Sequence, residues 1–508
     1  MNKLESGQVL PLGLVLVVMG MVGALIVYNT GVVATDKMRL ANGADAAAYS
    51  GALWQARALN YQAYANRAMV ANQVAIGQAV SIQSWMTYAA VTSENLATAL
   101  RPVPVLNIVT GGIQSAANVA ERVVSAGART MLSLSNIATA ALSASQDAMI
   151  VATVHNTAEM ISVVASETDK RFTTNSAYGI ANKVNNASQW WAFNTRYQKR
   201  DASAMQERLD IIMASRDKFT HARNWDLFSF WVPSSPRFSH KLRRQGQTRL
   251  VSVKTAQGLE WEWMAKDTLS IHTRKLRLFR SSAYYEFPVA WASAFTNSMD
   301  SRRSLTSRQC GVTGRYGLGS TLNQCSRFTT NNHDAESFAD KNVISLAGRH
   351  TLKPMPGYGG VRSFWVLSDE ARSAEDARLT VRVEVSLPLQ QMNESNTVAG
   401  TDRLQAPVIV AGNTLSALSS ADVYYRHPHH HIKDKSQREK ANAYSPYWQT
   451  QLVPVKQEER TAALLLRSGG VSPTARITSA NGSALDNYKE GSPDHFTTVQ
   501  ASKKWSYI

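Results

Sequence analysis

A short histidine cluster is the group of side chains in this chain whose type and spacing could hold a metal ion. His427, His429, His430 and His431 lie close together in one stretch, and imidazole nitrogens bind zinc, copper or nickel. A protein metal site needs three or four ligands in a fixed geometry, each oriented by supporting residues. Neighbouring histidines on one loop rarely meet that requirement, so these four are weak metal candidates. The sequence predicts a solvated loop there and no cofactor.

The chain has two cysteines, Cys310 and Cys325. Outside the cytoplasm they could form one disulfide that closes a loop of about 15 residues, worth roughly 3 kcal/mol in the chain-entropy model. Free buried thiols are the alternative. Neither cysteine belongs to a Cys-x-x-Cys pair, so the sequence supports neither redox catalysis nor a cysteine-based zinc site.

Catalytic motifs give no support to an enzyme. The sequence contains no Gly-x-Ser-x-Gly, no His-Glu-x-x-His and no phosphate-binding loop of the Gly-x-x-x-x-Gly-Lys type. We therefore expect a protein that binds or assembles rather than one that catalyses.

Positive charge is concentrated in one part of the chain. The formal net charge is +17, and residues 237–308 alone hold fourteen Lys and Arg against five acids. Such an excess favours anionic partners. If the region lies outside the cytoplasm, lipid headgroups or an anionic surface polymer are the expected partners and nucleic acid is not. Arg243, Arg244, Arg274 and Lys275 are the predicted basic surface, and a merely solvated face is the alternative.

These candidates must be positioned by a chain that begins with an apolar stretch. No charged residue occurs from Ser6 to Thr35. At about 1.5 Å per residue, a helix over 9–33 is long enough to cross a hydrocarbon layer of about 30 Å. We expect residues 1–8 in the cytoplasm and the bulk of the chain outside, as a single-pass membrane protein. A cleavable signal peptide is the alternative, but this stretch is longer than its usual apolar region.

Helix is predicted for residues 36–225, and charges are sparse from Ala46 to Ala165. Helices so poor in charge must cover most of their surface, against each other or against a partner subunit. The prolines in 101–104 predict the end of one long helix near Leu100, and Gly111-Gly112 predicts a further break. A more polar helix is expected over Glu167–His221.

Strand patterns dominate residues 240–467. The clearest is Arg378–Leu387, in which every second residue is Leu or Val. Val361–Leu367 is a further candidate strand, and Asn442–Val455 could close the domain. Residues 468–508 have the composition of a disordered tail. The predicted fold class is α+β: a transmembrane helix that continues into long Ala-rich helices, followed by a β-rich domain.

The N-terminal segment resembles a known family. A Gly-Gln pair precedes the apolar stretch, and Leu-x-Asn-x-Ala-Asp-Ala-Ala-Ala follows about thirty residues later. The matching residues are Gly7, Gln8, Leu40, Asn42 and Ala44–Ala48. Together they resemble the start of the TadE/TadG-like proteins of the tight-adherence (Flp) pilus system. The resemblance covers about the first 55 residues and implies an inner-membrane anchor that works with pilins or other pilus-assembly proteins.

Within that segment, Gly7 and Gln8 are the expected membrane-entry motif and Leu40, Asn42 and Asp45 the expected helix-packing motif. Asp45 is the one carboxylate on an Ala-rich face, and a buried carboxylate needs a partner. Arg39, or a cation of a neighbouring subunit, is the partner expected from the sequence. Related pilins carry Glu at the fifth position after the processed glycine. Here that residue is Leu12, so processing at Gly7 is not expected.

Two functions from different classes follow. The first is a membrane-anchored, non-enzymatic component that assembles or anchors an Flp-type pilus. The second is a tethered surface-binding module or adhesin for anionic polymer or carbohydrate, which would depend on the basic surface.

Overall fold

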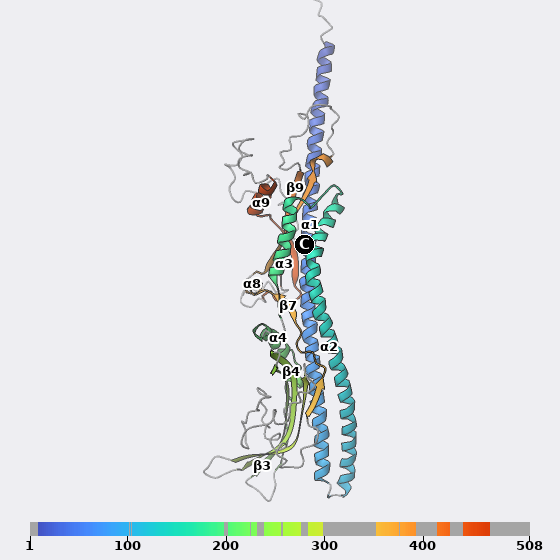
Figure 1. The fold of residues 1–508 in the computed structure, drawn as a ribbon, viewed down its shortest axis with the longest axis vertical. Coiled ribbons are helices and arrows are strands. Elements are labelled where there is room, and N and C mark those ends of the chain that lie inside the picture. Colours follow the sequence, from blue (N-terminus) through green and yellow to red (C-terminus); the bar gives the residue numbers. More distant parts are fainter. Residues whose placement is uncertain are drawn as a thin grey trace, which may run out of the picture. The chain divides into compact units, whose positions relative to one another are not determined.

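A computed structural model describes most of the chain up to Asn297 and four later segments. The described residues are 9–100, 102, 104–197, 202–223, 225–230, 238–255, 258–275, 283–297, 352–374, 376–392, 414–426 and 440–467. Long helices come first and strands dominate the later part, so the predicted α+β class is confirmed. Figure 1 shows the elements in sequence colours.

Two compact units divide the chain, and each draws on separate stretches of sequence. Unit 1 takes the chain up to Tyr64, Asp147–Thr195 and the part from Val366 onward. Unit 2 takes Ala65–Gln146 and Arg196–Trp365. Helices and strands are mixed in both units, so the succession of helical and β-rich regions describes the order along the chain rather than the packing in space.

Two long helices form the first third of the chain. Helix α1 covers Val9–Ala99 and helix α2 covers Pro104–Thr168. The break between them falls at the predicted prolines, because proline lacks an N–H and restricts the residue before it. Proline at the first position of α2 costs little, since that N–H has no partner within a helix. The predicted break at Gly111-Gly112 is wrong: α2 runs through both glycines.

The single helix predicted for Glu167–His221 is also wrong. The structure divides this region into α3 (Ala177–Phe193), β1 (Asn194–Tyr197), α4 (Ala202–Ala214) and α5 (Lys218–His221). The side chains of Ser176 and Asp217 cap α3 and α5, each accepting a hydrogen bond from a backbone N–H. Serine and aspartate compete with helical hydrogen bonds inside a helix and favour its start.

Unit 1 is built around a three-stranded antiparallel sheet. Its order is β10 (Trp448–Val453), β9 (Thr414–Tyr425) and β8 (Arg378–Pro388). The five Leu and Val residues predicted to share a face of β8 are all buried, which confirms that strand. Helix α1 is fixed to β10 by a reciprocal pair: Asn60 donates to the Trp448 carbonyl and accepts from its N–H, both at 3.0 Å.

Unit 2 contains a five-stranded sheet. The order is β2 (Trp225–Phe230), β3 (Phe238–Thr255), β4 (Gly258–Lys275), β5 (Ala283–Asn297) and β6 (Leu352–Pro356). Four strands pair antiparallel, and β6 joins β5 in parallel. Helix α1 packs on this sheet at Gly77, where the fully buried Trp263 fills the space that a side chain would need.

Shorter elements complete the two units. Strand β7 covers Phe364–Leu367, which is shorter than predicted, and is followed by α8 (Asp369–Ser373). A 3-10 turn, η1 (Leu389–Gln391), follows β8, and helix α9 covers Gln457–Arg467. The segment Asn442–Val455, which was expected to close the β-rich domain, contains β10.

Candidate membrane anchor and its docking site

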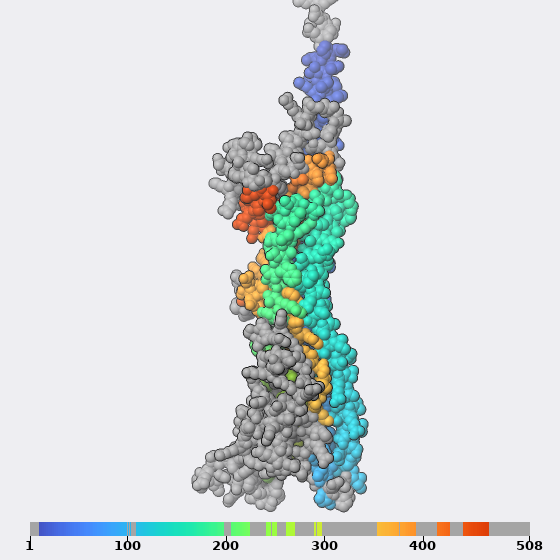
Figure 2. All heavy atoms as spheres, viewed as in Figure 1, coloured from blue at the N-terminus to red at the C-terminus, as the bar shows by residue number. Residues whose placement is uncertain are grey.

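The first turns of α1 form an apolar rod without any buried side chain. From Leu10 to Tyr28 every residue is exposed or half-exposed; Leu10 is 80% exposed and Leu14 64%. These turns are blue in Figure 2. Nineteen helical residues extend for about 28 Å, close to the thickness of a hydrocarbon layer. This part of α1 is apolar and long enough to cross a membrane.

One face of α1 becomes buried directly after this rod. Asn29, Val33, Asp36 and Leu40 follow one another at spacings of three or four residues, and each is buried. This is the spacing of a single helical face. Unit 1 therefore begins to cover α1 within a turn of the exposed rod, and the buried face extends into the Ala-rich motif.

An arginine between two carboxylates lies at the start of this buried face. Arg171, in the turn after α2, places its Nη2 at 2.9 Å from Asp36 Oδ1 and at 2.8 Å from Asp169 Oδ2. Its Nη1 donates to the carbonyl of Gln391 at 3.0 Å. The Asp36 side chain is only 3% exposed. Hydrogen bonds from Arg171 lower the pKa of Asp169 and outweigh the effect of its burial.

The residues of the predicted helix-packing motif do not all lie on the buried side of α1. Leu40 is buried and Asn42 is exposed. Asp45 accepts a hydrogen bond from the Ser419 hydroxyl of β9 at 2.7 Å. Within the chain the partner is therefore Ser419 and not the expected Arg39, whereas a cation of a neighbouring subunit stays a prediction. Burial raises the pKa of Asp45, and the bond from Ser419 only partly opposes this.

The small residues of the motif allow close packing. Ala44, Ala47, Ala48 and Ala52 are buried. At Gly51, a Cβ would lie 2.9 Å from Ile161 of α2 and 3.4 Å from Val381 of β8. The Ala-rich pattern thus brings α1 close to α2 and β8 in unit 1. Sequence reasoning missed Arg171 and Ser419, because neither belongs to a pattern that links it to the first helix.

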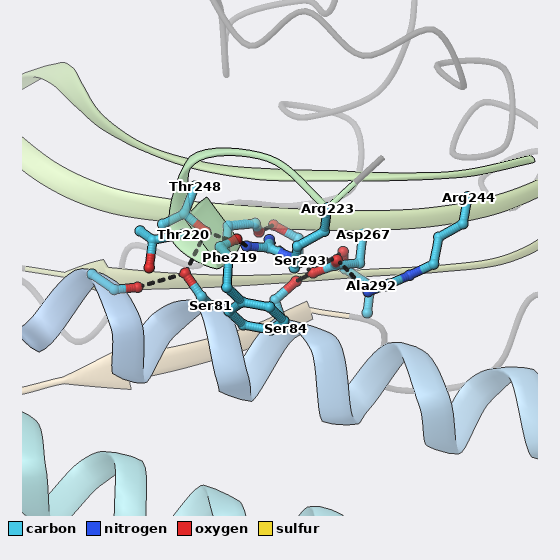
Figure 3. A network of polar contacts seen from close by, with 12 residues as sticks. Ser81, Ser84, Phe219, Thr220, Arg223, Arg244, Thr248, Asp267, Ala292 and Ser293 are labelled. Carbon is cyan, nitrogen blue, oxygen red and sulfur yellow. Dashed lines mark hydrogen bonds and ion pairs between the residues drawn. The ribbon is translucent and has the colours of Figure 1, made fainter. Parts of the chain in front are cut away.

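The predicted basic surface is partly wrong. Arg244 is buried in unit 2, with its side chain 3% exposed, and its Nη2 lies 3.2 Å from Asp267 Oδ1. Arg223 pairs with both oxygens of the same carboxylate at 2.8 and 3.1 Å, and Ser84 of α1 donates to it at 2.7 Å. Figure 3 shows this network between α1 and the sheet. Arg244 is therefore an interior residue. A buried carboxylate such as Asp267 is costly unless cationic and hydroxyl donors pair with it, and Arg244 is one of those donors.

Among the remaining predicted site residues, the structure describes only the side chain of Arg243, and the others stay predictions. Arg243 is half-buried. The side chains of Arg274 and Lys275 lie outside the described residues, as do Gly7, Gln8, Cys310, Cys325 and the four histidines. Among the residues that the structure describes, no three His, Cys, Asp or Glu side chains gather as a metal site requires.

Comparison with known proteins adds one finding. A family model described as Flp pilus-assembly TadE/G-like matches residues 7–57. The N-terminal segment is similar to that family. The match confirms the resemblance predicted from the Gly-Gln pair and the Ala-rich motif. Searches of curated proteins and of solved structures give no significant match.

The TadE/G-like segment coincides with two structural features of unit 1. Its first part is the exposed apolar rod, and its second part is the face of α1 that packs on β8, β9 and the end of α2. The family match therefore ends inside the buried helix rather than at a domain boundary.

Proposed function

We propose that the chain is a membrane-anchored, non-enzymatic component that assembles or anchors an Flp-type pilus. The observation that carries the proposal is the overlap of the TadE/G-like match with an apolar rod of membrane-spanning length. The rod crosses the inner membrane once, the N-terminus is cytoplasmic, and both units are periplasmic. Its partners are other pilus-assembly proteins or pilins.

The anchoring mechanism is mechanical in this proposal. Anchor and docking face belong to one uninterrupted helix, so no flexible linker separates the bilayer from unit 1. The Asp36–Arg171 pair and the Asp45–Ser419 hydrogen bond attach that helix to the rest of unit 1. A load on the periplasmic body is thus transmitted to the membrane through buried contacts.

Cell fractionation tests the anchor. A tagged full-length chain should be recovered in the inner membrane, whereas a Leu14→Arg, Val17→Arg double variant should be lost from it. Each arginine costs about 2.5–3.5 kcal/mol at the centre of a membrane helix. Met38→Arg is the matched control, because Met38 is exposed on the same helix beyond the rod. It should fractionate like the wild type.

Pilus counts on the same cells test the role. Cells with the double variant should carry few pili, and cells with Met38→Arg should carry the normal number. Recovery of the chain in sheared surface fibres would instead identify it as a fibre subunit. Normal piliation without membrane-bound protein would exclude the anchoring role.

A further inference from the structure

Helix α2 has an exposed face in unit 2 that is almost free of charge. Ala128, Leu132, Ser135 and Thr139 are buried on the opposite side. Between Ile108 and Ala144, a stretch in which all side chains are described, twenty residues are exposed and two of these carry charge. One partner in a stable protein interface contributes about 20–30 residues. The exposed face is therefore large enough for an interface.

Five of the eight large apolar side chains that are exposed between Ile108 and Ala144 follow a heptad repeat. From Val109 to Ala141 the spacing alternates between four and three residues over ten positions, with Ala, Gly or Thr between the large side chains. Leu134 and Ile137, two of these positions, are each 63% exposed. A strict spacing of this kind is the pattern of a left-handed coiled-coil seam. On α2 that seam faces outward rather than into the unit.

The charges on the face are placed where a second helix would not meet them. Arg122 and Arg129 are the two charged residues, and they lie seven residues apart. Both occupy the heptad position two residues after a seam residue, well away from the seam. The positions that flank the seam hold Gly, Ala, Val, Ser, Thr and Met. An identical helix can approach this face without repulsion between like charges.

We propose that this seam binds the same seam of a second copy, so that two α2 helices form a parallel coiled coil. The parallel direction rests on the proposed function, because copies anchored in one membrane point the same way. A common membrane also raises their effective concentration. A two-fold axis along the seam places each seam residue opposite the same residue of the second copy.

Cysteine cross-linking in cells tests the seam. In a full-length chain with Cys310 and Cys325 replaced by serine, Leu134→Cys or Ile137→Cys is introduced into two co-produced copies with different tags. Mild oxidation should give a band that carries both tags. Arg122→Cys is the matched control, exposed on the same helix but off the seam, and should give at most a trace of this band. Adding Leu134→Glu to the Ile137→Cys chain should abolish the cross-link.

The outcomes separate this inference from the proposed function. Double-tagged bands at the seam positions alone support the paired seam. Cross-linked bands of which none carries both tags mean another protein on this face, because pairing between copies would always include double-tagged pairs. Absence of any band in membrane-bound chain means lipid or solvent. Either result overturns the pairing while the anchor stands. If the chain is absent from the membrane fraction, the proposed function is contradicted. A double-tagged band from that soluble chain would still show that two copies pair along the seam.

Discussion

At the residue scale, the decisive interaction is that of Arg171 with two carboxylates in unit 1. Asp36 is almost fully buried beside an apolar rod, and an unpaired carboxylate there would be costly. The guanidinium pairs with Asp36 and Asp169 and also reaches the Gln391 carbonyl. It thereby joins α1, the turn after α2 and the 3-10 turn η1.

Replacing Arg171 with methionine should lower the free energy of unfolding by about 3 kcal/mol, because it leaves the buried Asp36 without a cation. Lys170→Met is the control: its partner Glu167 is exposed, so the change should stay within about 0.5 kcal/mol. Chemical unfolding of the full chain in detergent measures both. Equal effects of the two variants would contradict the role of Arg171.

Asp45 gives a prediction with a defined pH dependence. Burial raises its pKa above that of the unfolded chain, so the folded state holds this proton more tightly. Its contribution to stability is therefore full below about pH 4 and is lost as the pH rises through the folded pKa. Asparagine does not titrate, so the Asp45→Asn variant does not lose stability in this way as the pH rises. The variant should gain stability relative to the wild type as the pH rises, in unfolding series at several pH values.

Asp45→Ala should behave differently from the asparagine variant. It removes the acceptor of the Ser419 hydroxyl, which is 4% exposed. An unpaired buried donor costs about 1–3 kcal/mol. The alanine variant should be less abundant in cells, while the asparagine variant keeps its level. Immunoblots of membrane fractions measure this, and equal abundance would contradict the role of the hydrogen bond.

At the element scale, α1 is a core helix whose small residues set its distance from each sheet. In unit 2 Gly77 lies against the Trp263 ring, and the ring nitrogen donates to Gln73 one turn earlier at 3.2 Å. A hydrogen bond and a close contact from the same helix thus fix the indole. A larger residue at this point must displace α1 or the ring.

Gly77→Ala should destabilise the chain by about 1–3 kcal/mol, because its Cβ would lie 2.9 Å from the Trp263 ring. Gly111→Ala on α2 is the control, since nothing lies within 4 Å of a Cβ there. That control should be neutral or stabilise the helix by up to about 1 kcal/mol. Thermal unfolding of both variants checks the contrast, and a harmless Gly77→Ala would contradict the packing.

At the scale of the whole molecule, the chain passes between its two units in α1, α2, β1 and β7. Unit 1 therefore depends on both the first and the last described helices, α1 and α9. If the apolar rod crosses the membrane once, both units must lie on the same side of it.

A reporter fused after Ile508 tests this topology. Alkaline phosphatase, which requires the periplasm, should be active there, whereas a cytoplasm-dependent fluorescent protein should stay dark. Moving the reporters to a site before the rod should reverse both signals. Fluorescence at the C-terminal fusion would contradict the orientation.

Much of the architecture was determined by the sequence itself. The apolar stretch, the proline break near Leu100 and the alternation in Arg378–Leu387 each depend on residues close together in the chain. Local periodicity and backbone restriction therefore suffice to predict these elements. The TadE/G-like motif was predicted in the same way, from a spacing within the first 55 residues.

Only the tertiary structure decided what those elements pair with. The partner of Asp45 is hundreds of residues away in β9, and Arg244 is buried because Asp267 lies on the neighbouring strand. Sequence spacing carries no signal for such contacts, because they arise when distant segments exclude water together and each buried charge must find a donor or acceptor. The α2 seam is a further example. Its heptad pattern can be read from the local sequence, but which face of α2 is covered within unit 2 depends on the rest of the fold.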